Sequence, residues 1–344
     1  MQKMEKILFN TGSGTVAYVG SGALRMLGPS ASSSIKGRKA ALISDAGLPA
    51  EYQASVQAEL EAHGFSVYLR ALSGGEKNKK LSAVEDVYGF LYDSGVTRSD
   101  AVIALGGGVI GDIAGFAAAT YMRGTGFISV PTTLTAQTDS AFGGKTGVDF
   151  RSGKNMIGCF YNPAAVICDT DLLRTLPESE RINGMGEVVK YGAVADPCIL
   201  ESASRSIPSD ETVARCIKIK KRFVEADEYD KGERHILNFG HTFGHAIEEA
   251  SGYTVSHGQA VAYGMLIMIR LGEKLSLTGS ESFGAVRSAL LRAGLDAGFE
   301  PYIESSYPYI ARDKKYDGKK ISAVLLRRPG EAFLKELSPD EMRL

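Results

Sequence analysis

The stretch "DAVIALGGGVIGDIAGF", residues 100–116, joins two hydrophobic runs through three consecutive glycines. It contains the pattern G-x-G-x-x-G as Gly106, Gly108 and Gly111. The pattern follows a predicted strand and begins a predicted helix, which is the context in which it binds dinucleotide phosphates. Glycines let the backbone approach a phosphate, and the N–H groups of a helix N-terminus can hydrogen-bond to it. A tight strand–helix turn whose glycines serve only packing is the alternative interpretation.

This stretch departs from the usual dinucleotide pattern in two respects. It lies near residue 106 rather than after the first strand, and no acidic residue follows about 20 positions later to bind a ribose hydroxyl. Asp45, at the end of an earlier predicted strand, could bind the hydroxyl instead. Glu76 and Lys79 follow the end of another predicted strand, where ligands of open α/β sheets gather.

Around this stretch, predicted strands alternate with predicted helices. The strands are expected at residues 39–45, 65–72, 100–107, 126–133 and 164–169, and the helices at 48–64, 80–95 and 109–122. Such alternation predicts a parallel sheet covered by helices. From about residue 178 to 297 the periodicity is mainly helical, and residues 318–330 could hold a short strand pair. We expect two domains, residues 1–177 and 178–344, as the length also suggests.

The composition is that of an ordinary globular protein. Hydrophobic residues make up 44% of the chain, charged residues 23%, and the formal net charge is −1. No overall charge favours nucleic acid or an anionic membrane, so an anionic substrate would need a local basic pocket. No hydrophobic run reaches the roughly 20 residues of a membrane span. The N-terminal residues lack the hydrophobic core of a signal peptide. We expect a cytoplasmic protein whose four cysteines are reduced core residues.

The segment "NFGHTFGHAIE", residues 238–248, places His241 and His245 four residues apart on one helix face. This spacing resembles the zinc-protease motif H-E-x-x-H, but Thr242 replaces its general base. A catalytic zinc ion needs three protein ligands and one open position. His257, at the start of the next predicted helix, and Glu187, in "NGMGEVVKYG", are further candidates. Taken alone, the histidine pair is also compatible with packing, and Glu187 with a surface position.

The run "DSAFGGKTGVDFRSGKN", residues 139–155, is too rich in glycine for a regular helix and too long for a simple turn. It follows a predicted strand end at Thr132 and Thr133, and its Lys145 and Lys154 suit binding of phosphate or carboxylate. The alternative is a solvated surface loop. Arg123, after the preceding helix, is a further candidate anion contact.

Together these blocks, from about residue 40 to 325, closely resemble the 3-dehydroquinate synthase family in order, spacing and local context. The resemblance implies an N-terminal NAD-binding α/β domain with a parallel sheet and a mainly helical domain that binds metal and substrate. It implies a carbon–oxygen lyase of the shikimate pathway that uses NAD and zinc or cobalt, and usually a homodimer. The implied reaction converts 3-deoxy-D-arabino-heptulosonate 7-phosphate to 3-dehydroquinate and phosphate. It proceeds by transient oxidation by NAD, phosphate elimination, re-reduction, ring opening and aldol closure.

The resemblance also implies roles for individual residues. The metal ligands would be Glu187, His241 and His257, while His245 would be the catalytic histidine. The substrate pocket would comprise Asp139, Lys145, Asn155, Lys190, Lys220, Arg234, Asn238 and either Lys314 or Lys315. Arg123 would reach the neighbouring subunit's site. Cofactor contacts would come from Asp45, Gly74, Gly75, Glu76, Lys79, Gly108, Val109, Ile110, Gly111, Asp112, Thr132, Thr133, Lys145, Lys154, Leu172, Leu173, Arg174 and Thr175.

Three positions depart from the family pattern. Asp149 and Phe150 stand where the family commonly has Asn-His, and Gln259 stands where Glu is usual. Two rival functions remain open: a related sugar-phosphate cyclase, such as a 2-deoxy-scyllo-inosose or valiolone-type synthase, and a polyol dehydrogenase of the same superfamily. The blocks around Lys220, Arg234, Asn238 and His245 keep the dehydroquinate synthase pattern and argue against the first rival.

Overall fold

The computed structural model describes residues 4–12, 14–151, 153–310 and 320–344. The chain forms two compact units, Met1–Leu176 and Pro177–Leu344. The predicted Lys314 and Lys315 lie outside the described residues. No helix in the described part of the chain is long and hydrophobic enough to cross a bilayer.

The first unit is built on a seven-stranded sheet of order β1-β2-β9-β6-β5-β3-β4. The strands are β1 (Glu5–Phe9), β2 (Thr15–Val19), β3 (Lys39–Asp45), β4 (Ser66–Leu72), β5 (Ala101–Gly106), β6 (Gly126–Pro131) and β9 (Ala165–Cys168). Neighbouring strands run parallel except β1, which pairs with β2 in antiparallel orientation at the edge. The five strands expected from the sequence all form, whereas the β1–β2 hairpin was not anticipated.

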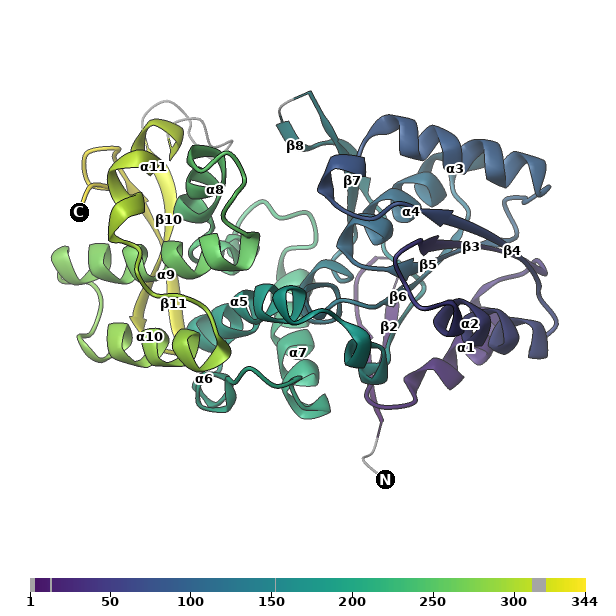
Figure 1. Ribbon diagram of the computed structural model, residues 1–344, viewed down its shortest axis with the longest axis horizontal. Coiled ribbons are helices and arrows are strands. Elements are labelled where there is room, and N and C mark those ends of the chain that lie inside the picture. The colour runs from purple at the N-terminus through teal and green to yellow at the C-terminus, as the bar shows by residue number, and fades with distance from the viewer. Residues whose placement is uncertain (1–3, 13, 152, 311–319) are drawn as a thin grey trace. The chain divides into compact units, whose positions relative to one another are not determined.

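Helices cover both faces of this sheet (Figure 1): α1 (Leu27–Ser34) and α2 (Ala50–Ala62) on one, α3 (Leu81–Asp93) and α4 (Gly108–Thr120) on the other. Alternate residues of β3 enter two separate cores: Leu42 packs with Leu27 and Leu60, while Ile43 packs with Val87 and Ile113. This is the period-two alternation of a strand buried on both faces, which explains its continuous hydrophobic run. The first unit is therefore the expected three-layer α/β domain.

The glycine-rich run 139–155 is more ordered than a surface loop. It begins in a π-helical turn, Ala136–Ser140, and continues into the antiparallel hairpin of β7 (Lys145–Phe150) and β8 (Gly153–Phe160). Gly147 and Gly158 face each other across the hairpin, and a Cβ on Gly158 would lie 2.1 Å from the carbonyl oxygen of Thr146. These two glycines therefore permit close strand approach, and the surface-loop interpretation was wrong for residues 145–150 and 153–155.

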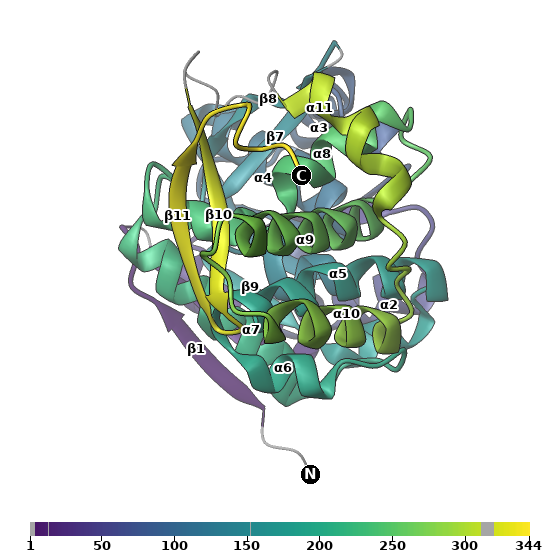
Figure 2. The ribbon, with the colours of Figure 1, turned by 90° about the vertical axis from the view of Figure 1, so that its left-hand side faces the viewer.

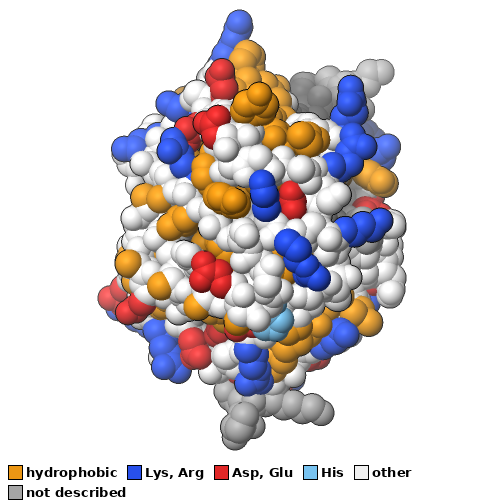
Figure 3. All heavy atoms as spheres, turned by 90° about the vertical axis from the view of Figure 1, so that its right-hand side faces the viewer, with side chains coloured by type: hydrophobic (Ala, Val, Ile, Leu, Met, Phe, Trp, Pro, Cys, Tyr) orange, Lys and Arg blue, Asp and Glu red, His pale blue; other side chains and the backbone are white. Residues whose placement is uncertain are grey.

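The face of the first unit drawn in Figure 3 carries no block of one charge. Figure 3 shows Lys and Arg side chains interspersed with Asp and Glu side chains and with separate hydrophobic groups. This arrangement agrees with the formal net charge of −1.

The second unit is mainly helical, as predicted for residues up to 297. Its helices are α5 (Glu178–Ala195), α6 (Pro197–Ser202), α7 (Asp210–Ala226), α8 (His241–Ala250), α9 (His257–Lys274), α10 (Glu281–Ala293) and α11 (Ile303–Ile310). The strands β10 (Ile321–Arg328) and β11 (Glu331–Leu337) form an antiparallel pair, so the expected range of residues 318–330 holds only the first of the two strands. Helix α9 is buried on all sides from residue 260 to 269 and contacts α5, α8, α10 and β10 (Figure 2). It is the central helix of this unit.

Short helical turns complete both units. They are η1 (Ala23–Met26), η2 (Glu76–Asn78), η3 (Tyr121–Arg123), η5 (Thr170–Thr175), η6 (Glu233–Asn238) and η7 (Glu300–Tyr302).

The cysteines correct one expectation. All four are free, and Cys168 and Cys216 are buried as predicted, but Cys159 is half-buried and Cys198 is exposed. Burial raises the pKa of the Cys168 thiol far above its usual range, because the thiolate would lose its hydration. Cys198 lies at the beginning of α6, where its backbone N–H donates a hydrogen bond to Asp196.

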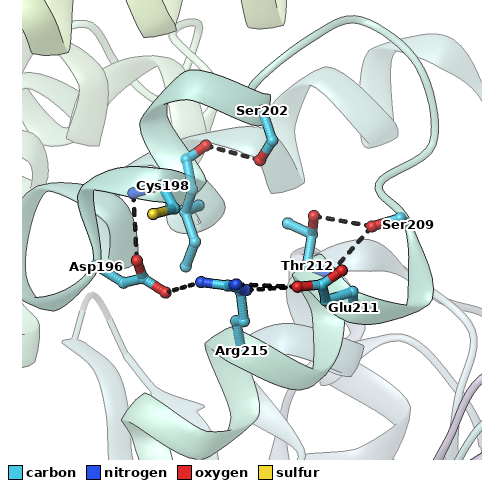
Figure 4. A network of polar contacts seen from close by, with 8 residues as sticks. Asp196, Cys198, Ser202, Ser209, Glu211, Thr212 and Arg215 are labelled. Atoms are coloured by element: carbon cyan, nitrogen blue, oxygen red, sulfur yellow. Dashed lines mark hydrogen bonds and ion pairs between the residues drawn. The ribbon is translucent and has the colours of Figure 1, made fainter.

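A polar network holds the corner between α6 and α7 (Figure 4). Asp196 caps α6: its Oδ1 accepts a hydrogen bond from the N–H of Cys198 at 3.2 Å. Its Oδ2 lies 2.9 Å from Nη1 of Arg215 on α7, and Arg215 also binds Glu211 one turn earlier. Ser209 caps α7 through the N–H of Thr212. The Asp196 carboxylate thus serves both as the cap of α6 and as the acidic partner of Arg215.

Substituting Asp196 separates these two contributions. Asp196→Ala should lower the free energy of unfolding by about 1 kcal/mol, since Ala cannot cap the helix. Asp196→Asn keeps the cap and loses only a partly exposed ion pair, so its effect should be smaller. Urea unfolding monitored by circular dichroism measures both. Equal losses in the two variants would mean that the cap contributes little.

Candidate active site and metal centre

Three helices of the second unit bring an acid and two histidines together. Glu187 lies on α5, His241 begins α8 and His257 begins α9. Oε1 of Glu187 is 3.3 Å from Nε2 of His241 and 3.2 Å from Nε2 of His257. One ligand atom from each residue lies within 4.8 Å of the other two. The structure therefore places the three sequence-predicted metal ligands in one cluster.

Close helix contacts at glycines create this cluster. A Cβ on Gly258, next to His257, would lie 1.9 Å from the carbonyl oxygen of Asn183 on α5. The N–H of Gly258 donates to Oδ1 of Asn183 at 2.6 Å, which ties the start of α9 to α5. A Cβ on Gly264 would likewise lie 1.9 Å from the carbonyl oxygen of Gly240, just before α8. Only glycine permits these backbone distances, so α5 and α8 both approach α9 closely where the ligands project.

The cluster favours a negative charge on Glu187. Burial alone would raise the pKa of this carboxyl, but the charges of Lys190 and His241 hold it well below its usual range. Burial lowers the pKa of His241, although Glu187 opposes the shift. Burial also disfavours charge on His257, but hydrogen bonds to Glu187 and Glu248 outweigh it and raise the pKa of His257 to about 10. An ionised carboxylate between two imidazoles is a place that stabilises positive charge, carried by a proton or by a metal ion.

The donor set fits a divalent metal. Two imidazole nitrogens and one carboxylate oxygen are the ligands of many catalytic zinc ions. A second group, His245, Glu248 and His257, satisfies the same distance limit. It shares His257 with the first, but His245 is exposed whereas Glu187 has only 1% of its surface exposed. The ring centroids of His241 and His245 are 5.4 Å apart, so His245 lies beside the first group.

Basic side chains are buried in the same unit. Lys190 on α5, Lys220 on α7 and Arg234 in η6 are all nearly inaccessible, and these three elements contact one another. Nη1 of Arg234 donates to the carbonyl oxygen of Glu228 at 2.7 Å. Asn238 ends η6 and is half-buried. Lys190 forms an ion pair with Oε2 of Glu187, so it is joined directly to the metal cluster.

In the first unit, the glycine turn lines a pocket at the beginning of α4. Gly106, Gly108 and Gly111 line it together with Asp112 and Lys145. β5 leads directly into α4, as the sequence predicted. The N–H groups at the start of α4 and the Lys145 ammonium can both interact with an anion here.

A buried ion pair lies next to this turn. Nζ of Lys79 is 2.6 Å from Oδ2 of Asp112 and also donates to Oδ1 of Asn155. Burial raises the pKa of Asp112 to about 6, although the Lys79 charge opposes this shift. Burial disfavours the charged form of Lys79, but Asp112 outweighs it and raises the pKa of Lys79. Lys79 thus contacts both Asp112, a second predicted cofactor residue, and Asn155, a predicted substrate residue.

Other predicted cofactor residues lie at the carboxyl ends of the strands. Gly74 packs against the Asp45 carboxylate, which accepts the N–H of Gly47 at 2.9 Å. Gly75 has a φ of 88° and precedes Glu76 in η2. Thr132 and Thr133 follow β6, with Thr133 packed against Gly107. These positions form the edge of the sheet at which α/β proteins bind ligands.

The remaining predicted residues differ in accessibility. Ile110, Leu172 and Leu173 are core residues, so only their backbone can meet a ligand. Val109 is half-buried in the first turn of α4. Arg174 pairs with Asp171, Thr175 donates to the Tyr52 hydroxyl, and Lys154 lies in β8. Asp139 lies in the π-helical turn, and the exposed Arg123 ends η3 with a φ of 64°.

The sequence interpretation missed two residues of the metal cluster. Asn183 ties α9 to α5, and Glu248 accepts a hydrogen bond from His257. Glu248 lies one turn after His245 on the same predicted helix, so the sequence already indicated that the two side chains share a helix face. Its contact with His257 was not, because that contact depends on how α8 and α9 pack.

Comparison with known proteins identifies the family. Residues 69–183 match the family model of the 3-dehydroquinate synthase N-terminal domain, and residues 184–316 match that of the C-terminal domain. A 3-dehydroquinate synthase of Streptococcus thermophilus is 42% identical over 332 residues, which is 94% of each chain. This chain belongs to the 3-dehydroquinate synthase family. The 3-dehydroquinate synthase of Streptococcus mutans is also 42% identical, over 89% of each chain.

Solved structures confirm the predicted fold class for this family member. A 2-deoxy-scyllo-inosose synthase in complex with carbaglucose-6-phosphate, NAD+ and Co2+ is 27% identical, with a TM-score of 0.87 over 99% of this chain and 98% of that one. Glycerol dehydrogenase from Schizosaccharomyces pombe is 16% identical, with a TM-score of 0.60 over 95% of this chain and 86% of that one. The latter likeness concerns the fold alone.

The Gly258→Ala variant tests whether the close contact between α5 and α9 positions the three candidate metal ligands. The new methyl group would meet a backbone oxygen, so we expect the free energy of unfolding to fall by about 1–3 kcal/mol and zinc affinity to fall with it. Gly284→Ala, at an exposed position of α10, is the matched control, because its Cβ would meet nothing within 4 Å. That variant should gain up to about 1 kcal/mol of helix propensity and keep its zinc affinity. Urea unfolding and zinc titration measure both, and a Gly258→Ala protein as stable as the control would contradict the packing argument.

Proposed function

We propose that this protein is a 3-dehydroquinate synthase, a carbon–oxygen lyase of the shikimate pathway. It converts 3-deoxy-D-arabino-heptulosonate 7-phosphate to 3-dehydroquinate and inorganic phosphate. The observation that carries the proposal is the cluster of Glu187, His241 and His257 in a chain of the 3-dehydroquinate synthase family. Curated relatives with this name are 42% identical over most of the chain.

The two units have separate roles in this proposal. Residues 1–177 bind NAD, and the glycine turn with Lys145 receives the anionic part of a ligand. Residues 178–344 bind the metal, through Glu187, His241 and His257, and most of the substrate. The cofactors proposed are NAD and a zinc or cobalt ion; a solved cyclase that is 27% identical holds NAD+ and Co2+. When bound, NAD supplies a reversible hydride acceptor, and the metal ion supplies Lewis acidity toward a substrate hydroxyl.

The chain's own residues bind charge and move protons. The substrate carries a carboxylate and a phosphate, and Lys190, Lys220 and Arg234 are buried cations that can hold such groups. Because these side chains are fixed within packed helices, they stabilise developing negative charge with little reorganisation. Asn238, Asp139, Asn155 and one of Lys314 and Lys315 complete the proposed substrate contacts. His245 is exposed beside the metal cluster, where its imidazole can take or return a proton.

We further propose a cytoplasmic homodimer in which Arg123 reaches the neighbouring subunit's site. Arg123 is exposed at the end of η3 and held in a left-handed backbone conformation. An exposed guanidinium on a short turn is suited to binding an anion outside its own unit.

A related sugar-phosphate cyclase is the second candidate. The high TM-score of 0.87 to 2-deoxy-scyllo-inosose synthase favours it, since the two chains share nearly their whole fold. The lower identity of 27%, against 42% for the dehydroquinate synthases, argues against it.

The full-length protein should release one phosphate for each 3-dehydroquinate formed when given the heptulosonate phosphate, catalytic NAD and zinc. No net NADH should accumulate, because the reaction returns its hydride. Phosphate release, product chromatography and NADH absorbance provide the measurements. Metal removal by a chelator should abolish turnover, and added Zn2+ or Co2+ should restore it.

Three outcomes of this assay would contradict the proposal. The first is absence of phosphate release from the heptulosonate phosphate. The second is preferential turnover of glucose 6-phosphate, whose carba analogue occupies the solved cyclase. The third is stoichiometric NADH formation from a polyol such as glycerol.

Single substitutions test the separate roles that we propose for the three histidines. His241→Ala and His257→Ala should abolish zinc binding, whereas His245→Ala should retain zinc and lose turnover by roughly 10²–10⁴-fold. Metal content after dialysis and steady-state rates measure these effects. His63→Ala in the first unit is the control, since His63 contacts only Glu59 and α1 among the described contacts, and it should retain both properties. Full zinc occupancy in His241→Ala would exclude the proposed ligand set.

A further inference from the structure

Both ring nitrogens of His257 face a carboxylate. Nε2 lies 3.2 Å from Oε1 of Glu187, and Nδ1 lies 3.2 Å from Oε2 of Glu248. Glu248 is 5% exposed, and Glu187 is 1% exposed. His257 is thus bracketed by two buried acids on two different helices, α5 and α8.

The number of protons on the His257 imidazole determines which of these two contacts can be a hydrogen bond donated by the ring. A neutral imidazole has one N–H donor, and an ionised carboxylate can only accept. When one nitrogen of His257 gives its lone pair to a cation, the proton must remain on the other nitrogen. The carboxylate facing that other nitrogen then fixes the tautomer and the ring orientation.

The contacts of His241 indicate which ring nitrogen of each histidine would face a bound metal ion. Its Nε2 lies 3.3 Å from the same Oε1 of Glu187, while its Nδ1 lies 3.2 Å from the carbonyl oxygen of Phe239. Both histidines therefore present Nε2 to Glu187 and Nδ1 to an acceptor. The acceptor is a backbone carbonyl for His241 and the side chain of Glu248 for His257.

The backbone around Glu248 is fixed by the turn that connects α8 to α9. Its carbonyl oxygen accepts hydrogen bonds from the N–H of Tyr253 at 2.8 Å and from the Ser251 hydroxyl at 3.0 Å. The turn therefore folds back on the end of α8. This brings His257, nine residues after Glu248, into contact with the Glu248 carboxylate.

We propose that Glu248 is a positioning residue that accepts the Nδ1–H of His257 and so holds Nε2 toward the metal. The inference rests on the metal site of the proposed function. Glu248 itself is not a ligand: its oxygen faces Nδ1, whereas Nε2 of both histidines converges on Glu187. The alternative group of His245, Glu248 and His257 would instead require the exposed His245 and the Nδ1 atom of His257.

The test compares Glu248→Ala, Glu248→Gln and the wild-type chain in equilibrium binding of Zn2+, by competition with a chromophoric chelator. The visible absorption spectrum of the Co2+ form reports the donor set independently of activity. Loss of an acceptor that orients a ligating histidine weakens metal binding about 10–100-fold, which is the effect expected for Glu248→Ala. Glu248→Gln keeps a neutral acceptor of about half the strength, so we expect a loss of about 3–10-fold. Both variants should keep the band positions of the wild-type Co2+ spectrum.

Glu249→Gln is the matched control, because it makes the same change at the next, exposed residue of α8. It should bind Zn2+ within twofold of the wild type. Circular dichroism and urea unfolding of the metal-free proteins establish that each variant is folded. If Glu248→Ala does not fold, Glu248→Gln decides alone.

Zinc affinity within twofold of the wild type in folded Glu248→Gln would overturn the inference, and so would unchanged affinity in folded Glu248→Ala. A Co2+ spectrum whose band positions differ from those of the wild type would also overturn it, by showing that Glu248 is a ligand. These failures differ from failure of the proposed function. In that case the wild-type chain would itself bind no Zn2+ or show no phosphate release.

Discussion

The close approach of α5 and α8 to α9 is the constraint on which the metal cluster depends. A carboxylate oxygen can lie within about 3.3 Å of two imidazole nitrogens only if three helix backbones come close together. Gly258 and Gly264 provide this approach by presenting no side chain at the contact. The hydrogen bond from Gly258 to Asn183 then fixes the register of α9 against α5. The buried charge of Glu187 is tolerated because cationic and hydrogen-bonding groups surround it.

In the first unit, an ion pair compensates the acidic charge that lies beside the glycine turn. Asp112 lies within the first turns of α4, where a carboxylate would compete with any bound phosphate for the helix N-terminus. Its ion pair with Lys79 compensates that charge locally. The N–H groups of the turn and the ammonium of Lys145 remain as the positive part of the pocket. Asn155 contacts the same Lys79, so the hairpin of β7 and β8 is coupled to this pair.

Much of the fold was predictable because its elements are encoded locally. The run at β3 is hydrophobic on both faces, and the packing of Leu42 and Ile43 into two cores explains that pattern. The β1–β2 hairpin and the β7–β8 hairpin were missed, since their strands carry short or glycine-interrupted hydrophobic patterns. In β7 and β8 the glycines serve strand contact, a role that cannot be separated from loop formation without the partner strand.

The site was predictable to the extent that each residue carries a motif. Glu187, His241 and His257 were identified from family blocks, and the structure brings them together. Glu248 and Asn183 lie inside these blocks, but the sequence did not reveal their roles, because those roles arise from contacts between different helices. Likewise, the sequence could not reveal that Leu172 and Leu173 are buried, which limits any ligand contact there to the backbone.

The contacts of His257 span very different distances along the chain. Glu248 is nine residues away, whereas Glu187 is 70 residues away. Closing the short loop costs much less conformational entropy than closing the long one, and contacts between near neighbours form faster. The α8–α9 hairpin can therefore bring His241, Glu248 and His257 together before α5 docks. We therefore expect Glu187 to join the two histidines last during folding, when α5 packs against α8 and α9.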